Sequence, residues 1–278
     1  MERPSRVPQT VDFDTPSAAR IYDYWLGGAH NFAVDREAAR AVTDAVPTAP
    51  AIAQANRAFL HRAVRWLTDQ GIRQFLDIGS GIPTGGNVHE VAQRAAPDSR
   101  VVYVDLDPIA VAHSREILAC DDRAVAIEED LRRPAAILAH PKLRAVLDLD
   151  RPVGLLLVSV LHFVPATDDP YGAVQHLRDA LAPGSFLALT HGAVDGFDRA
   201  AAATTKQIYQ STSGPTGELR TREQIQAFFG DFDLVEPGLV WMSQWRPDQG
   251  AEAGRPDGHP ERSAFLAGVA RKPAPPRS

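Results

Sequence analysis

The spacing of apolar residues along the chain changes near residue 72. Before this point, apolar residues recur every three or four positions, most clearly in the segment 50–70, as on the core-facing side of a helix. After it, short apolar runs alternate with segments of helical spacing. Because parallel strands are joined by crossovers that are usually helices, this alternation predicts a doubly wound α/β fold with a mostly parallel sheet, preceded by a helical extension.

The predicted elements follow from this change in spacing. Helices are expected in the extension at residues 18–26, 35–45 and 50–70. In the sheet domain, strands are expected at 74–78, 100–104, 124–128, 153–160 and 185–190, with helices at 87–96, 108–118, 134–139 and 171–181. The last part of the chain carries strand-like segments at 232–235, 239–245 and 264–270, with an exposed loop at 246–262. We therefore expect a seven-stranded sheet, with a strand pair after the fifth strand.

The chain divides into four parts on this interpretation. Residues 1–13 and 272–278 are expected to be disordered tails, residues 14–71 a helical extension that could form a lid, and residues 72–271 the core. The run 153–160 is apolar except for Ser159, which is typical of a central strand covered on both faces.

Composition and charge narrow the classes of function. Apolar residues make up 44% of the 278 residues, and the net charge of −6 gives no electrostatic footprint for nucleic acid. No apolar run is long enough to span a bilayer, and no signal-peptide core precedes the first helix. No HExxH or comparable histidine spacing is present, so we predict no metal. These features predict a soluble cytoplasmic protein and disfavour nucleic acid as a partner. We expect a small-molecule substrate, although composition does not separate it from a macromolecular one, and the oligomeric state stays open.

A glycine-rich turn follows the first predicted strand, with the sequence Asp77-Ile78-Gly79-Ser80-Gly81. Two glycines two positions apart leave bare backbone at the carboxyl edge of the sheet, where a ligand can lie against the chain. Asp105 ends the second strand, and a carboxylate there can accept hydrogen bonds from both hydroxyls of a ribose. Asp77, Gly79, Ser80, Gly81 and Asp105 are therefore predicted to bind a nucleoside cofactor.

Residues after the third predicted strand indicate how the base of that nucleoside could be bound. Asp130 follows this strand and could accept a hydrogen bond from an adenine amino group, while the backbone N–H of Leu131 could meet a ring nitrogen. Leu106, after the second strand, and Ser159, near the end of the fourth, belong to the same edge. These four residues complete the predicted cofactor site.

Two cofactors compete for such a site. A dinucleotide needs a third glycine, in the pattern G-x-G-x-x-G, so that the helix can approach a pyrophosphate, but Thr84 stands there. Asp77 would repel a pyrophosphate and instead suits the ammonium and sulfonium groups of S-adenosylmethionine. The residues therefore favour an S-adenosylmethionine-dependent methyltransferase. A regulatory protein that binds the donor without catalysis, and an NAD-linked oxidoreductase, stay as alternatives.

With these motifs the chain resembles class I S-adenosylmethionine-dependent methyltransferases. It is most similar to an actinobacterial family of S-adenosyl methyltransferases of largely uncharacterised function. The matching segments, which span nearly the whole chain, are 19–28, 31–32, 35–38, 56–60, 75–81, 86–92 and 102–105. The resemblance implies a Rossmann-like fold and S-adenosylmethionine as the donor, and it implies no particular acceptor. The chain departs from the family pattern at Ala29, where a lysine is expected, at His30, where an acidic residue is expected, and at Leu106, where an asparagine is frequent.

Catalytic residues are harder to predict, because methyl transfer is an in-line displacement that depends largely on positioning. His162 and His191 follow the fourth and fifth strands, at the edge where the methyl group would project, so either could remove a proton from the acceptor. Alternatively, each is a loop histidine that bonds to the backbone.

Aromatic and polar residues of the extension could cover this edge. Tyr22, Tyr24, His30, Asn31 and Arg57 are predicted to form a lid or an acceptor pocket. Aromatic residues at helical spacing can also pack in a core, and an arginine on a helix can also be solvated.

Overall fold

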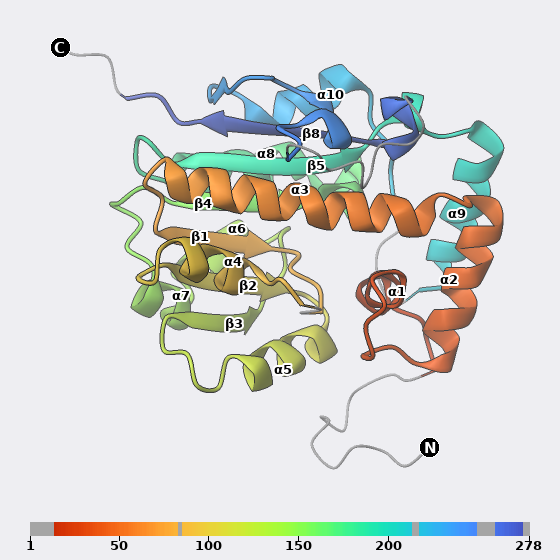
Figure 1. The fold of residues 1–278 in the computed structure, drawn as a ribbon, viewed down its shortest axis with the longest axis horizontal. Coiled ribbons are helices and arrows are strands. Elements are labelled where there is room, and N and C mark those ends of the chain that lie inside the picture. The colour runs from red at the N-terminus through yellow and green to blue at the C-terminus, as the bar shows by residue number, and fades with distance from the viewer. Residues whose placement is uncertain (1–13, 83–84, 213–216, 249–258, 275–278) are drawn as a thin grey trace.

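The centre of the molecule is one mixed sheet (Figure 1). The computed structural model describes residues 14–82, 85–212, 217–248 and 259–274. Its strands are β1 (Gln74–Ile78), β2 (Arg100–Asp105), β3 (Ala124–Glu128), β4 (Gly154–Val158), β5 (Phe186–Gly192), β6 (Asp233–Leu234), β7 (Val240–Trp241) and β8 (Phe265–Arg271). The predicted tail at 1–13, and residues 275–278 of the other predicted tail, lie outside the described residues.

The order of the strands, β3-β2-β1-β4-β5-β8-β6, confirms the predicted doubly wound fold. Strands β1 to β5 pair in parallel, and β8 pairs antiparallel with β5. The chain proceeds from β1 outward to β3 and then crosses to β4, so the strand order reverses between β1 and β4. Ligands of open parallel sheets bind beyond the carboxyl ends of the strands at such a point. The described sheet has one strand more than predicted, because β6 and β7 both pair with β8.

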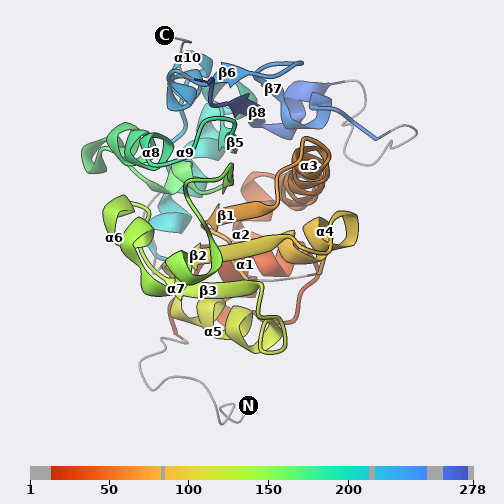
Figure 2. The same ribbon diagram turned by 90° about the vertical axis from the view of Figure 1, so that its left-hand side faces the viewer.

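Helices cover both faces of the sheet and wall off its carboxyl edge. They are α1 (Ala18–Trp25), α2 (Ala33–Ala45), α3 (Ala49–Asp69), α4 (Val88–Ala95), α5 (Pro108–Ile117), α6 (Pro134–Ala139), α7 (Pro141–Val146), α8 (Pro170–Asp179), α9 (Arg199–Gln210) and α10 (Arg222–Gln226). Figure 2 shows α6, α7 and α8 on one face of the sheet, and α3 and α4 on the other. Side chains of β4 alternate accordingly. Leu155 and Leu157 pack in the core layer on the α8 face of the sheet, and Leu156 and Val158 pack in the core layer on the α3 face. α1, α2 and α9 lie together beyond the carboxyl ends of the parallel strands, at the right of Figure 1.

Two predicted strands are shorter than their apolar runs. β4 ends before Ser159, whose φ of 59° turns the chain out of the sheet. The segment predicted as a strand at 239–245 keeps only β7, and a 3-10 turn, Met242–Gln244, then carries Trp245 beneath α3. There Trp245 is fully buried, with its ring edge-on to that of Phe59. Burial of a large aromatic ring therefore decides the path of this segment over its strand-like sequence.

Three described helices, α7, α9 and α10, lie where the apolar spacing predicts none. All three have local signals at their N-termini. The His140 ring accepts a hydrogen bond from the N–H of Lys142 in the first turn of α7. Asp198 accepts hydrogen bonds from two backbone N–H groups of the first turn of α9, and Thr221 forms a capping box with Gln224 at the start of α10. The loop predicted at 246–262 lies partly outside the described residues, and its last part includes the 3-10 turn Pro260–Ser263.

A buried ion pair fixes the N-terminal part of this wall. Nε of Arg20 in α1 lies 2.8 Å from Oδ2 of Asp35 in α2, and the two side chains are 3% and 0% exposed. Asp35 also accepts hydrogen bonds from the backbone N–H groups of Ser17 and Phe32. Ser17 precedes α1, but its hydroxyl donates to Asp107, just before α5, at 2.5 Å instead of capping its own helix. This bond ties the helical wall to the edge of the sheet.

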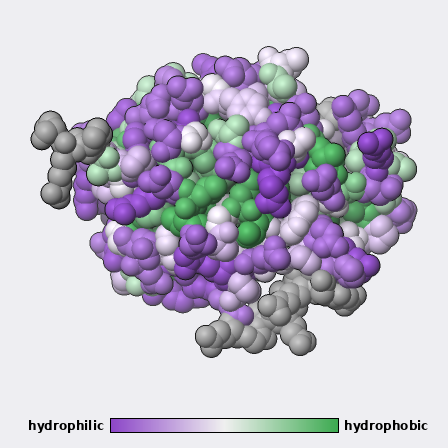
Figure 3. Space-filling view, turned by 90° about the horizontal axis from the view of Figure 1, so that it is seen from above, coloured by the Kyte–Doolittle hydropathy of each residue, from purple (hydrophilic) through white to green (hydrophobic). Residues whose placement is uncertain are grey.

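The surface is mostly polar over the sheet edge formed by β6 to β8. Figure 3 shows this face, where apolar residues form a central band within a polar surround. In the part of the chain that the structure describes, the exposed large apolar side chains are Leu106, Ile117 and Val194. No described helix is both long and apolar enough to cross a membrane.

We expect Asp35→Ala to lower the free energy of unfolding by about 3–5 kcal/mol, because it leaves the Arg20 guanidinium buried without a counter-charge. Urea denaturation followed by circular dichroism measures the change. Glu37→Ala, at an exposed position of the same helix, is the matched control and should change stability by less than about 0.5 kcal/mol. A loss for Asp35→Ala no larger than that of the control would show that the ion pair does not hold α1 and α2 together.

Candidate active site

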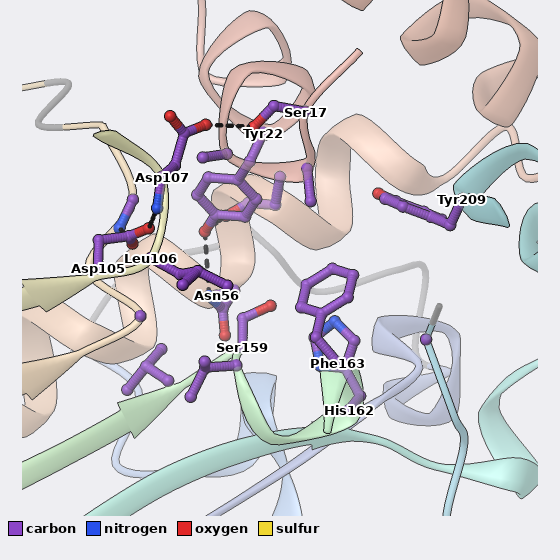
Figure 4. A pocket seen from close by; sticks show the side chains of 18 of the residues that line it. Ser17, Tyr22, Asn56, Asp105, Leu106, Asp107, Ser159, His162, Phe163 and Tyr209 are labelled. Atoms are coloured by element: carbon purple, nitrogen blue, oxygen red, sulfur yellow. Dashed lines mark hydrogen bonds between the residues drawn. The ribbon is translucent and has the colours of Figure 1, made fainter. Parts of the chain in front are cut away.

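A cavity of about 510 Å³ opens between the carboxyl edge of the sheet and the wall that α1, α3 and α9 form. Its volume falls in the range of sites that hold cofactors and other small molecules. Figure 4 shows two sides of this cavity: Asp105 and Leu106 lie on one, Phe163 and Tyr209 lie on the other, and Ser159 lies between them. We call the first the carboxylate side and the second the aromatic side.

The turn after β1 forms part of the carboxylate side. Gly79 and Gly81 have φ values of 74° and 66°, in the left-handed region that glycine adopts without strain. A Cβ at residue 79 would also lie 2.3 Å from Cγ2 of Val160. Gly79, Ser80 and Gly81 all line the cavity. The turn therefore presents bare backbone to a ligand, and a side chain at residue 79 would collide with Val160.

Asp77, just before this turn, is 5% exposed and lines the cavity. Burial raises the pKa of its carboxyl to about 7; the Arg57 guanidinium opposes this shift, and Asp105 adds to it. Arg57 lines the same cavity from α3, and its Nε is buried without a hydrogen-bond partner among the described residues. Asp77 and Arg57 thus present opposite charges to one cavity, which suits a ligand that carries both an ammonium and a carboxylate group.

Asp105 ends β2 and accepts two backbone hydrogen bonds, from the N–H of Gly81 at 2.7 Å and from that of Asp107 at 2.8 Å. Burial raises the pKa of Asp105 to about 6, because these bonds offset only part of the desolvation. A carboxylate has about four acceptor sites, so Asp105 can accept further hydrogen bonds from a ligand. Leu106, beside it, is 48% exposed and lines the cavity. Together they offer a polar and an apolar contact.

Asp130 lines the cavity, but Arg132 already binds both of its carboxylate oxygens at 2.6–3.0 Å. Arg132 also donates to Asp168 at 3.1 Å. Although burial acts to raise it, the hydrogen bonds from Arg132 lower the pKa of Asp130. A ligand at this carboxylate must therefore share it with Arg132, a contact that the sequence analysis did not anticipate. Leu131 is buried and lines the cavity.

A chain of hydrogen bonds crosses the cavity wall from the sheet to the helices. The backbone N–H of Ser159 donates to Oγ1 of Thr190 at 2.9 Å, and the Thr190 hydroxyl donates to Oδ1 of Asn56 at 2.6 Å. Nδ2 of Asn56 donates to the Tyr22 hydroxyl at 3.0 Å, as Figure 4 shows, and Tyr22 donates to the carbonyl of Ala53. Ser159 and Tyr22, both predicted site residues, are therefore fixed by one network.

His191 does not suit the predicted role of a base. It is fully buried in β5 and is not part of the cavity wall. Its Nδ1 donates to the carbonyl of Gly192 at 2.9 Å, and its Nε2 accepts from Arg220 at 2.7 Å. Burial lowers the pKa of His191 to about 3, and Arg220 adds to the shift, so the ring is neutral. With both nitrogens bonded, His191 has no free position for a proton from a substrate.

His162 lines the cavity from the 3-10 turn Leu161–Phe163. Its Nδ1 is buried without a hydrogen-bond partner in the described part of the chain. Burial, followed by His191 and Arg220, lowers the pKa of His162 well below its usual value, so this ring is also neutral. Arg220, which the sequence analysis did not single out, donates to carbonyls at both ends of the turn, at 3.1 and 2.8 Å. It therefore positions the turn that carries His162.

The predicted lid residues divide into two groups. Tyr22 and Arg57 line the cavity, whereas Tyr24, His30 and Asn31 do not. Tyr22 and Tyr24 are two positions apart on α1, so they cannot share a helix face. Asp23 holds the following loop away from the cavity, because its carboxylate accepts hydrogen bonds from the His30 N–H and the Asn31 side chain at 2.9 and 2.8 Å.

The aromatic side of the cavity went largely unpredicted. Its walls include Phe163, Phe197, Tyr209 and Phe265. Tyr209 comes from α9, and the Asp198 cap of that helix is the one local signal that points to it.

Comparison with known proteins adds a second line of evidence. The family described as S-adenosyl methyltransferase matches residues 4–273. A methyltransferase candidate from Thermobifida fusca YX shares 41% sequence identity over 98% of this chain and 100% of its own, with a TM-score of 0.88. A DUF574 family protein from Streptomyces avermitilis MA-4680 shares 42% identity over 94% of this chain and 99% of its own, also with a TM-score of 0.88. No curated protein matches the chain.

The extent of these matches and the geometry of the carboxylate side agree. The chain therefore belongs to the S-adenosyl methyltransferase family, which confirms the predicted fold, the enzyme class and S-adenosylmethionine as the cofactor.

Proposed function

We propose that the protein transfers the methyl group of S-adenosylmethionine to a small molecule bound on the aromatic side of the cavity. The observation that carries this proposal is that the glycine turn and the carboxylates share one continuous cavity with an aromatic region. Two reactants held in one enclosed space are oriented for an in-line displacement, and orientation supplies much of the rate. Bound S-adenosylmethionine supplies an electrophilic methyl group on a sulfonium, and the protein supplies binding, orientation and exclusion of water.

Asp77 and Arg57 would hold the amino-acid end of the donor. The Asp77 carboxylate would accept hydrogen bonds from the ammonium group, and the Arg57 guanidinium would donate to the carboxylate. Asp77 and Nε of Arg57 are buried, so each charge gains from an opposite charge on the ligand. Gly79, Ser80 and Gly81 would bring bare backbone close to this end.

Asp105 would accept hydrogen bonds from the ribose hydroxyls, since its bonds to backbone N–H groups leave acceptor sites free. Leu106 would cover one face of the sugar or base with apolar surface. Asp130 and Leu131 would meet the adenine, with Asp130 keeping its contacts to Arg132. Ser159 would complete the donor site between the two sides of the cavity.

Residues 14–71 would cover the bound donor, because α1 and α3 form part of the cavity wall and Ser17 is bonded to Asp107 at its rim. Such a wall favours a free small molecule over a site within a folded macromolecule. His162 is the group available to take a proton when the acceptor must lose one.

The two alternatives make separate predictions. A protein that only binds the donor would form no S-adenosylhomocysteine with any acceptor, and an NAD-linked oxidoreductase would be stabilised thermally by NAD. No observation on the cavity favours either of them over methyl transfer.

We expect Asp105→Asn to weaken S-adenosylmethionine binding by about tenfold or more, because an amide has one acceptor oxygen and no charge to assist the hydrogen bonds. Isothermal titration calorimetry measures the dissociation constant. Asp179→Asn, an exposed position on α8, is the control and should bind as the wild type does. If wild-type protein gave no binding heat with millimolar S-adenosylmethionine, the proposal would fail.

We expect donor binding to tighten about tenfold between pH 6 and 7.5. The pKa of Asp77 is about 7, and only its ionised form attracts the ammonium group, so each pH unit below 7 costs up to about tenfold in affinity. Asp77→Asn should bind weakly and flatten this profile, leaving the smaller dependence that comes from Asp105, whose pKa is about 6. Calorimetry across this pH range measures both curves.

Thermal unfolding of the ligand-free variant separates lost binding from lost folding. The folded-state pKa of Asp77 is raised above its ordinary value of 3.8, so its ionisation costs stability as pH rises from about 4 to about 7, and the cost is constant above 7. Asp77→Asn should therefore be more stable than the wild type at pH 7.5, with a difference that shrinks toward pH 4. A variant that unfolds more readily at pH 7.5 would contradict this account of Asp77.

A further inference from the structure

The aromatic side of the cavity differs in composition from the carboxylate side. The ring of Phe163 lies 5.6 Å from that of Tyr209, and the ring of Phe265 lies 5.3 Å from that of His162, with all four residues in the cavity wall. Trp25 and Phe197 line the same region. Flat apolar walls of this kind bind aromatic rings, which pack edge-on or offset against them.

The positions of charged side chains narrow the class of ligand that this side can bind. In the part of this wall that the structure describes, the charged side chains are at the rim: Lys206 is exposed, and Glu218 is bound by Arg220 and by the backbone N–H of Ala166. A carboxylate or an ammonium group moved from water to this side would lose its hydration and find no buried counter-charge. This side of the cavity therefore favours an acceptor that is uncharged when it binds.

Two buried polar atoms on this side need a partner. Nδ1 of His162 and Oγ1 of Thr205 form no hydrogen bond with any described residue, and both residues line the cavity. Such atoms cost free energy when they stay unpaired, and a ligand that bonds to them recovers it. Burial keeps the His162 ring neutral and raises the pKa of the Tyr209 hydroxyl, so the imidazole can accept a hydrogen bond while the phenol keeps its proton. In Figure 4 the Tyr209 hydroxyl points into the space beside Phe163.

We propose that the methyl acceptor is an uncharged aromatic hydroxyl compound, whose ring packs against Phe163 and Tyr209 and whose hydroxyl donates to His162. This inference rests on the proposed function. The acceptor oxygen forms a bond to the methyl carbon as the S–C bond breaks, and the electron pair of that bond stays on sulfur. As the oxygen bonds to the methyl carbon its proton becomes strongly acidic, so it passes even to the weakly basic imidazole of His162, which returns it to water. The products are an aryl methyl ether and S-adenosylhomocysteine.

Binding to protein saturated with S-adenosylhomocysteine tests the acceptor class without turnover. Calorimetry compares 2-naphthol with 2-methoxynaphthalene, which has no hydroxyl proton, with 2-naphthoate, which is an anion, and with 2-naphthylmethylamine, which is a cation. We expect 2-naphthol to bind at least about tenfold more tightly than each of the others, since one hydrogen bond or one buried charge is worth at least that much. Tighter binding of the anion or the cation would overturn the proposal, as would a failure of both 2-naphthol and the three-ring 2-anthrol to bind.

His162→Phe tests the contact to the hydroxyl. The variant keeps an aromatic ring beside Phe163 and Phe265 but removes the acceptor nitrogen, so 2-naphthol and its methyl ether should bind with equal affinity. A general loss of packing would instead weaken both ligands alike and keep their ratio. His176→Phe, at an exposed position on α8, is the control and should keep the wild-type ratio. Unchanged selectivity in His162→Phe would overturn the assignment of His162.

Turnover provides the second readout. With 2-naphthol as acceptor, His162→Phe should form S-adenosylhomocysteine about 10²-fold more slowly than the wild type, as is usual when a proton acceptor is removed. Failure of S-adenosylhomocysteine itself to bind would count against the proposed function. If S-adenosylhomocysteine binds and the naphthyl ligands show no preference for the hydroxyl compound, only the acceptor class is wrong.

Discussion

A buried carboxylate to which no cation among the described residues is bonded is the constraint around which this site is organised. Asp77 lies on the central strand β1, between β2 and β4, where its ionisation at neutral pH costs stability. The apolar layers on both faces of the sheet stabilise the fold enough to tolerate that cost, as is common at functional sites. Arg57 supplies a charge that acts across the cavity without a hydrogen bond to Asp77, so both groups stay available to a ligand.

The helical wall and the sheet edge form one unit around this carboxylate. Arg20 and Asp35 join α1 to α2, Ser17 joins α1 to Asp107, and Asn56 joins α3 to Thr190 of β5. These contacts link segments far apart in the sequence at the rim and the wall of a single cavity. The N-terminal residues therefore do more than cover the sheet, since they supply polar side chains to the site itself.

The carboxylate side could be predicted because its chemistry is local in sequence. A strand, a glycine pair after it and an acidic residue at a strand end can each be recognised from a few neighbouring residues. The parallel topology then brings such strand ends together. The same reasoning missed Arg132, because the contact of Asp130 with a residue two positions later depends on the loop conformation. It also could not separate His162 from His191, because each comes directly after a segment that the sequence predicts to be a strand. The two differ in their contacts. Arg220, 29 positions after His191, donates a hydrogen bond to Nε2 of His191, whereas His162 lines the cavity.

The aromatic side of the cavity depends less on the core of the sheet than the carboxylate side does. No described residue of α9 is fully buried, and this helix packs mainly on α2 rather than on the sheet. Residues 205 and 209 can therefore change with little effect on the sheet or on the carboxylates at its edge. The two sides of the cavity therefore depend on different parts of the fold, the carboxylate side on the sheet edge and the aromatic side partly on a peripheral helix. Exchange of side chains on this single helix would alter the shape of the aromatic side and leave the strand ends of the carboxylate side in place.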